Sequence, residues 1–347
     1  MRKILIGFMV VLVISAALYF RFRHAAGPRE VVYAGNRELT LWSTTAQVRA
    51  PVATVKYGER LDVLGRSEDQ VRVQTTGGSI GWTSEADLLS ADLWQRANDL
   101  EVAASKAPIE ARGHTHAISN LHLEAGRETP RLRQLNKGVP VDLFERKAVQ
   151  VPTSGASPAV EEKNASTGSP SDAASDTAVP QVRKEDWWLV RAHLPDQTSA
   201  AGWILARFID LEVPEPLPDY ASAAAMRIVA WFELSHVVDA AGERKPQYLV
   251  VGNRGPEGQP CDFTMMRVFT WGKRKERYET AYVESDVCGK LPVNLTQPAP
   301  PGGDVIFAFE DLSNGAPEER KYRMASTMVR RVKEGGSEPV KKKHARG

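Results

Sequence analysis

The side chains that could serve in catalysis are few and widely spaced in this chain of 347 residues. The two cysteines are Cys261 and Cys288, and the only histidine after them is His344, in the basic tail. A cysteine nucleophile works with a histidine base, often at a helix start, whereas Cys261 precedes a run with the alternation of a β-strand. We therefore expect neither cysteine to be catalytic, and no other catalytic residue is predicted.

The two cysteines are instead placed to form a disulfide bond. Residues 262–271 and 277–285 read as the strands of a hairpin that turns near residues 274–275. Cys261 and Cys288 lie equally far from that turn, and antiparallel pairing brings such positions close together. In an oxidising compartment we expect a Cys261–Cys288 bridge; the alternative is a pair of reduced, buried thiols.

Three histidines that lie near one another in sequence, His114, His116 and His122, have the chemistry of metal ligands. The first two fall in a polar linker and His122 alternates with leucines on an expected strand, so we expect no metal site. The sequence has no phosphate loop, nucleophile elbow or dinucleotide fingerprint. With a net charge of +2 and no nucleic-acid motif, we predict a non-enzymatic protein with no cofactor and no nucleic-acid partner.

An internal repeat organises the middle of the chain. The segment VKYGERLDVL at 55–64 matches LNKGVPVDLF at 135–144, and each copy later contains a Gly-Trp pair. The offset grows from 80 residues at the glycines to 121 at the tryptophans, so the second copy carries an insertion. We place it at 148–184, a Ser-, Ala- and Pro-rich stretch expected to be disordered. The matched positions are Gly58 with Gly138, Asp62 with Asp142, and Trp82 with Trp203.

The order of these features resembles the bacterial Src-homology-3-like (SH3-like, SH3b) domain family. Each copy has a strand, a loop with a proline, a glycine turn before the matched aspartate, and the Gly-Trp pair near its end. The resemblance implies two small β-barrels at 37–90 and 115–212, and barrels of this size protect their strand edges. The linker 91–114 is expected to contain one helix, from about Ala91 to Ser105.

Tryptophans are the residues best suited to binding a ligand. SH3-like folds hold extended peptides in aromatic-lined grooves, so Trp187, Trp188 and Trp203 are the candidate ligand-binding residues. Trp187 and Trp188 are neighbours on a strand and point to opposite faces, so we expect one of them in the core and the other exposed. The first copy has Gln70 and Val71 at these positions, which makes its barrel the poorer candidate.

The C-terminal third reads as a different β domain. Residues 222–333 contain alternating runs with little helix, which predicts an all-β barrel or sandwich, and residues 334–347 read as a disordered basic tail. This part resembles no family that we can name. The six expected strands are 227–235, 247–252, 262–271, 277–285, 305–310 and 322–332.

The N-terminus carries an apolar run, Ile4–Phe20, with basic residues on both sides. Its length is at the short end of what spans a bilayer. We interpret residues 1–26 as a retained signal anchor; the alternative is a signal peptide cleaved near Ser15-Ala16-Ala17. The expected location is the inner membrane, with a single span and the domains in the periplasm or outside the cell.

These features favour a membrane-anchored, extracytoplasmic binding or scaffold protein. The resemblance implies cell-wall peptidoglycan as the ligand class, and an envelope protein is the other expected partner. A second hypothesis is a protein-interaction module whose barrels are spacers that present the C-terminal domain. A third is an unrecognised envelope hydrolase built on that domain.

Overall fold

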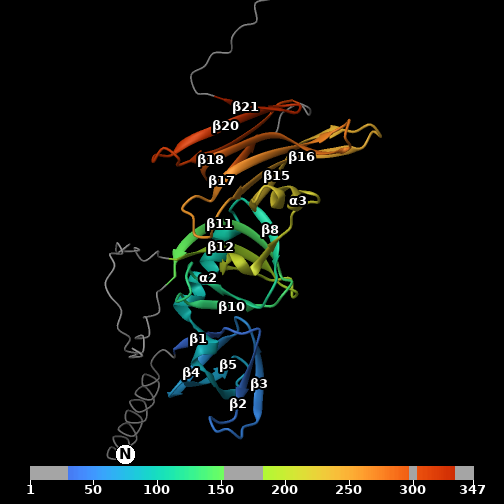
Figure 1. The fold of residues 1–347 in the computed structure, drawn as a ribbon. Helices are drawn as coiled ribbons and strands as arrows, with labels where there is room; N and C mark the ends of the chain where they lie inside the picture. The colour runs from blue at the N-terminus through green and yellow to red at the C-terminus, as the bar shows by residue number, and fades with distance from the viewer. Residues whose placement is uncertain (1–29, 152–182, 297–302, 333–347) are drawn as a thin grey trace, which may run out of the picture. The chain divides into compact units, whose positions relative to one another are not determined.

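The computed structural model describes residues 30–151, 183–296 and 303–332 (Figure 1). The apolar run, most of the insertion and the basic tail lie outside this range. The described chain is mainly β, as predicted, with three seven-stranded antiparallel sheets and two α-helices. It divides into two compact units, one made of the described residues up to Asp99 with Leu132–Gln134, and the other of the remainder.

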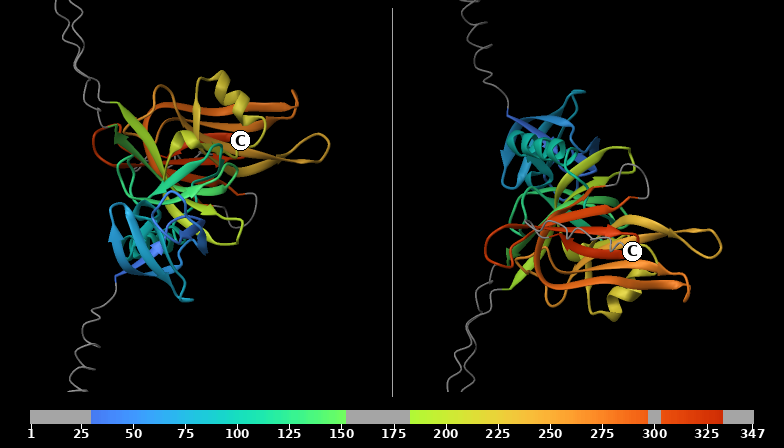
Figure 2. Two further views of the ribbon diagram at one scale, coloured as in Figure 1. Left: turned by 90° about the horizontal axis from the view of Figure 1, so that it is seen from below. Right: turned by 90° about the horizontal axis from the view of Figure 1, so that it is seen from above.

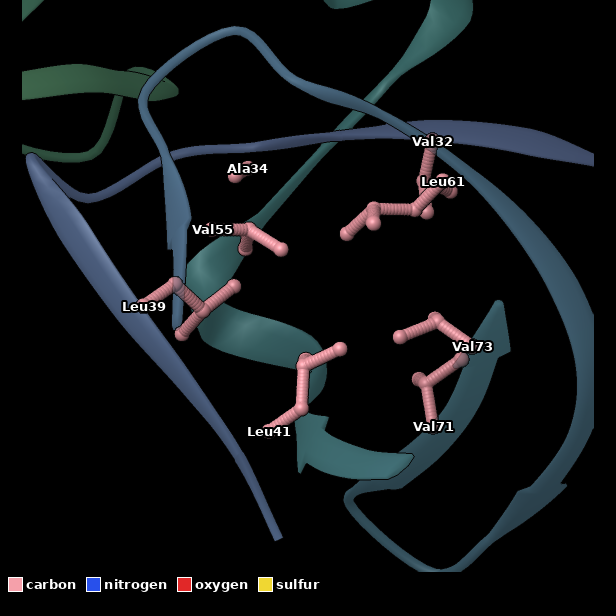
Figure 3. Close-up of a cluster of buried hydrophobic side chains, with 8 residues drawn as sticks. All are labelled: Val32, Ala34, Leu39, Leu41, Val55, Leu61, Val71 and Val73. Carbon is pink, nitrogen blue, oxygen red and sulfur yellow. The ribbon is translucent and has the colours of Figure 1, made fainter. Parts of the chain in front are cut away.

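The first sheet has strand order β3-β2-β6-β5-β4-β1-β7. Alternate side chains of β1, β2 and β5 face one aliphatic core, together with Val55 and Leu61 (Figure 3). Strand β1 lies before the expected start of this domain at residue 37. The strands are β1 (Val31–Ala34), β2 (Glu38–Trp42), β3 (Pro51–Lys56), β4 (Arg60–Ser67), β5 (Gln70–Thr75), β6 (Ile80–Ser84) and β7 (Leu88–Ser90).

The second sheet repeats this topology, with strand order β10-β9-β13-β12-β11-β8-β14. A short 3-10 helix precedes the last strand of each sheet, Glu85–Asp87 in the first and Ala206–Phe208 in the second. The strands are β8 (Ala111–Thr115), β9 (Ser119–His122), β10 (Arg131–Leu135), β11 (Pro140–Gln150), β12 (Lys184–His193), β13 (Ser199–Leu205) and β14 (Ile209–Leu211).

The insertion is narrower than the range 148–184. Strands β11 and β12 continue their pairing to Gln150 and Lys184, so Ala148–Gln150 are strand residues. The two β-bulges also match between the copies: one lies at Val63/Gly65 in β4 and the other at Leu143/Glu145 in β11. A bulge that recurs at the same place in two sheets is a local feature of the repeat.

The expected linker helix is α2 (Ala91–Ala104). Ser90 caps its start, because the Leu93 backbone N–H donates to the Ser90 Oγ at 3.1 Å. Toward its end, Leu100 and Ala104 pack with Trp187 and Leu189 of the second sheet. The C-terminal end of the helix, from Leu100, therefore packs against one face of β12.

The third sheet is a meander of seven strands, β15 to β21 in order, seen from two opposite sides in Figure 2. The expectation of six strands is wrong: residues 322–332 form parts of two strands, because Ser326 adopts φ +55° and the chain reverses there. A seven-residue helix, α3 (Leu217–Ala223), precedes the sheet. The strands are β15 (Arg227–Val238), β16 (Arg244–Asn253), β17 (Phe263–Gly272), β18 (Arg277–Thr296), β19 (Val305–Asp311), β20 (Glu318–Ala325) and β21 (Met328–Val332).

The predicted disulfide is confirmed. Cys261 and Cys288 are bonded, with their Cα atoms 4.8 Å apart, at the open end of the β17–β18 hairpin, where Phe263 pairs with Gly289. In the part of the chain that the structure describes, no helix is long and apolar enough to span a bilayer. The predicted anchor, Ile4–Phe20, lies outside that part.

Candidate ligand-binding site

The repeated residues occupy equivalent backbone positions in the two sheets. Gly58 and Gly138 both adopt a left-handed conformation, with φ +77° and +80°, which favours glycine. Asp142 accepts hydrogen bonds from the Arg112 Nε at 3.3 Å and the His193 Nε2 at 2.7 Å. Asp62 instead pairs with Arg60 at 3.0 Å. These positions maintain the strands and turns of the sheets.

The tryptophan of each Gly-Trp pair lies opposite the equivalent strand of its sheet. Trp82 pairs with Trp42 on β2, and Trp203 pairs with His122 on β9. Trp82 is half-buried, whereas Trp203 is buried. The Lys147 Nζ lies 4.4 Å from the centre of the Trp203 ring, so a cation covers this tryptophan.

The expectation that one of the paired tryptophans is exposed is wrong. Trp187, Trp188 and Trp203 are 3%, 5% and 5% exposed. Trp187 packs in the cluster under α2. Trp188 lies in the wall of a cavity that also includes Ile228 and Val229 of β15. Both faces of β12 are therefore covered, one by the helix and the other by the third sheet.

A pocket of about 270 Å³ opens on the second sheet beside Trp187. We call it the arginine pocket, because three arginines contribute to it together with polar and apolar side chains. The residues that line it are Ile118, Ser119, Asn120, His122, Arg127, Arg131, Trp187, Leu205, Arg207 and Phe208.

Two of the three arginines are held by one buried carboxylate, Glu185. Arg127 donates to it from Nε at 2.8 Å and from Nη2 at 2.6 Å, and the Arg207 Nη1 lies 3.3 Å from it. The hydrogen bond from Arg127 lowers the pKa of Glu185, so this carboxylate stays charged. The side chain of Arg131 has no hydrogen bond or ion pair with any residue that the structure describes.

His122 is a neutral imidazole in a fixed tautomer. Its Nδ1 lies 3.0 Å from the Thr129 carbonyl oxygen, and because a carbonyl only accepts, Nδ1 carries the proton. Burial and the nearby Arg131 charge lower the pKa of His122. Nε2 is therefore a hydrogen-bond acceptor, and the ring lies edge-on to Trp187 at 5.3 Å.

Ser119 lies in the same lining with an unused hydroxyl. It is 5% exposed, and its Oγ has no hydrogen-bond partner among the described residues. A buried hydroxyl without a partner is costly. At the matched position the first sheet has Leu39, which packs in its core.

A second cavity, of about 390 Å³, lies between the second and third sheets. Beside it is a buried charge cluster centred on Arg146, which we call the Arg146 cluster. Its guanidinium bonds the Asp186 carboxylate at 2.5 Å, the Asp262 carboxylate at 3.3 Å and the Cys261 carbonyl at 2.8 Å. The Gly258 N–H also donates to Asp186 at 2.9 Å. The two sheets are thus joined by charge-assisted hydrogen bonds.

Glu110 is a further buried acid at this junction. Burial raises its pKa to about 7, the Val293 backbone N–H lowers it, and the negative charge of Asp262 adds to the rise. One carboxyl oxygen, Oε2, has no partner among the described residues. A carboxyl in this environment is protonated more readily than one in water.

The remaining residues with reactive chemistry are not assembled into a site. The His114 Nε2 and His116 Nδ1 lie 3.8 Å and 3.5 Å from the carboxylate of Asp210. His122 has a different partner, the Thr129 carbonyl oxygen. Among the described residues no group of three or more metal-ligating side chains is present. Both cysteine sulfurs are in the disulfide, so neither is a thiolate.

Trp187, a ligand-binding candidate from the sequence, lines the arginine pocket, whereas the arginines around it were not predicted. Arg207 is far in the chain from Arg127 and Arg131, and it meets them only because β13 lies beside β9 in the sheet. Comparison of the two copies gives one indication of these arginines. At the positions of Arg131 and Arg207 the first copy has Pro51 and Ala86, so only the second copy is positively charged there.

No family model matches the chain, and no curated protein matches it. Solved structures that align with it include an NlpC/P60 family protein from Bacillus cereus ATCC 10987, at 11% identity and TM-score 0.22, over 74% of this chain and 94% of that one. Another is NlpC2 from Trichomonas vaginalis, at 10% identity and TM-score 0.17, over 88% of this chain and 96% of that one. Alignments at these TM-scores carry no argument about fold or function.

Proposed function

We propose that this chain is a membrane-anchored, extracytoplasmic binding protein with two SH3-like barrels. Its second barrel binds a ligand of the cell envelope, either cell-wall peptidoglycan or the peptide of an envelope protein. The anchor, Ile4–Phe20, holds it in the inner membrane. The protein acts by binding and positioning its ligand, without an enzymatic step.

The observation that carries this proposal is the difference between two sheets of the same strand order. The arginine pocket of the second sheet has an aromatic wall, and within the described residues the Arg131 guanidinium and the Ser119 hydroxyl have no partner. The corresponding positions of the first sheet hold Leu39, Gln70 and Asp87 in place of Ser119, Trp187 and Phe208. A pocket with few convergent polar groups on an apolar wall is the usual form of a ligand site.

The test is retention of the full-length protein, solubilised in detergent, on purified cell wall. Retention above that of a matched membrane protein is expected, and circular dichroism checks that the sheets are folded. A folded protein that passes through the wall column contradicts the peptidoglycan form of the proposal. If the protein does not bind the wall, capture of a defined envelope protein in cells supports the envelope-peptide form of the proposal. Failure to capture one contradicts both forms.

A second candidate follows from the Arg146 cluster. A buried ion-pair cluster fixes how the third sheet is held against the second, as a spacer that presents a domain requires. Photo-crosslinkers at Met328, exposed on the third sheet, and at Ile118, exposed at the arginine pocket, separate the two candidates in the intact chain. A partner trapped from Met328 alone favours the spacer, and one trapped from Ile118 favours the pocket.

A further inference from the structure

The arginine pocket contains one cation, Arg131, whose side chain no group of the described residues bonds. Glu185 offsets a single positive charge among the three arginines, and it is bound by Arg127 and Arg207. We propose that the arginine pocket binds the free carboxylate at the end of a peptide-like ligand, with Arg131 as its counter-ion. This inference rests on the proposed function, since it names the ligand class of the same site.

A carboxylate is the anion that suits this arrangement. A guanidinium offers two parallel N–H donors to the two oxygens of a carboxylate. The side-chain amide of Asn120 and the hydroxyl of Ser119 lie in the same lining. The Ser119 Oγ is buried and has no partner among the described residues. A hydrogen bond from this hydroxyl to a ligand oxygen would satisfy it.

The neutral histidine specifies the group next to the carboxylate. The Nδ1–H of His122 donates to the Thr129 carbonyl oxygen. The other ring nitrogen, Nε2, is therefore available as a hydrogen-bond acceptor. A peptide supplies the matching donor, because the amide N–H of its last residue lies beside the terminal carboxylate. Simple carboxylic acids such as acetate lack this donor and are expected to bind less tightly.

The apolar walls define the rest of the ligand. Ile118, Trp187, Leu205 and Phe208 surround the polar groups, which favours an aliphatic side chain next to the carboxylate. At about 270 Å³ the pocket is just below the roughly 300–1,000 Å³ of pockets for drug-sized ligands. It therefore fits the last one or two residues of a peptide, and inorganic phosphate leaves its walls unused.

The probes are acetyl-L-Ala-L-Ala, acetyl-D-Ala-D-Ala, their C-terminal amides and inorganic phosphate, titrated by calorimetry into the full-length protein in detergent. We expect at least one free acid to bind, and its amide to bind at least about tenfold more weakly, the loss of about 1.4 kcal/mol that one charge-assisted bond accounts for. Preference for the D-form indicates a cell-wall peptide, and preference for the L-form a protein C-terminus. Equal binding of acid and amide, tighter binding of phosphate, or no binding of any acid overturns the inference.

Two arginine variants localise the effect. Arg131→Gln is expected to weaken binding of the acid about tenfold or more. Arg49→Gln is the matched control, because Arg49 lies over Trp42 of the first sheet, at 4.4 Å from the ring centre, and is expected to change nothing. Equal effects of the two variants overturn the assignment. If the protein is retained on cell wall but binds none of the carboxylate probes, this inference alone is contradicted. If it binds a carboxylate probe but neither cell wall nor an envelope protein, the proposed function alone is contradicted.

Discussion

The same arginine has opposite surroundings in the two repeated sheets. Arg66 of β4 and Arg146 of β11 each follow the matched bulge and pair across to β5 and β12. Arg66 bonds Glu30 and Glu85 of its own sheet, at the surface. The second sheet has Ala111 and Ala206 at those places, so Arg146 turns to Asp186 and Asp262. The arginine of the first sheet thus bonds only within its own sheet, whereas Arg146 bonds Asp186 of its own sheet and also Asp262, next to the third sheet.

The difference shows how a duplicated fold acquires a new contact without a new backbone. The side chain of Arg66 is 40% exposed and that of Arg146 is 2% exposed. Exposed ion pairs contribute little to stability, whereas a buried charge must keep its partners. The first sheet is therefore expected to tolerate loss of its arginine, and the second is not.

The largest predicted effect tests this directly. Arg146→Ala is expected to lower the free energy of unfolding of the second and third sheets by about 3–5 kcal/mol, because it leaves Asp186 and Asp262 buried without a counter-charge. Arg66→Ala, the matched control, is expected to cost at most about 1 kcal/mol. Hydrogen exchange measured by mass spectrometry reports each sheet separately. Equal protection in the two variants would show that the buried arginine is not structurally important.

The disulfide is expected to have the next largest effect, again limited to one part of the chain. It closes 27 residues in the third sheet, and removing such a bridge costs about 3 kcal/mol. The backbone carbonyl of Cys261 also accepts a hydrogen bond from Arg146. Reduction of the disulfide should therefore lower the melting temperature of the third sheet and leave that of the first sheet unchanged. The double variant Cys261→Ala, Cys288→Ala should not respond to reductant. A loss of protection in the first sheet would contradict this prediction.

Glu110 is expected to make the second and third sheets dependent on pH. Its folded pKa is raised to about 7, so between its ordinary value and pH 7 the folded state keeps a proton that the unfolded state has lost. Stability therefore falls as pH rises through this range, by at most about 1.4 kcal/mol per pH unit, and the penalty is absent below the ordinary value. Denaturation from pH 4 to 8 measures the slope. Glu110→Gln, which mimics the protonated form, should flatten it, and an unchanged slope would exclude Glu110.

The smallest effect is predicted for Ser119→Ala, with Leu39→Ala as the contrasting variant at the matched position of the first sheet. Ser119→Ala removes an unpartnered buried hydroxyl and is expected to leave stability unchanged or raise it by about 1 kcal/mol. Leu39→Ala at the matched core position is expected to cost about 2–5 kcal/mol. Thermal unfolding of both variants provides the measurement. A large destabilisation by Ser119→Ala would mean that the hydroxyl is bonded in the empty protein.

Local patterns predicted the parts of this fold that depend on neighbours in sequence. Alternating side chains gave most strands, the linker helix was expected from about Ala91 to Ser105, and equal distances from a turn placed the disulfide. The repeat led to two sheets of the same strand order, although β1 and β8 were missed. Both are short runs that begin before the expected starts of the two domains at residues 37 and 115, and most of Ala111–Thr115 was assigned to the linker. Ser326 concealed a turn because it is neither glycine nor proline.

The site could not be predicted in the same way. The burial of Trp188 depends on a third domain, and nothing in its strand records that contact. Arg131 and Arg207 are ordinary surface arginines in the sequence, and only the pairing of distant strands brings them to Trp187. Asp262 and Arg146 are separated by 116 residues, so their bond depends on tertiary structure that local pattern does not encode.

The paired ends of the insertion have a further consequence for how this chain can change. Gln150 and Lys184 lie opposite each other on β11 and β12, so the segment between them leaves and rejoins the sheet at one place. Because the cost of closing a loop grows only slowly with its length, sequence can be added or removed there with little strain on the sheet. The position is therefore suitable for inserting a reporter or an affinity tag. It lies at the end of the strand pair that carries Trp187 and Arg146.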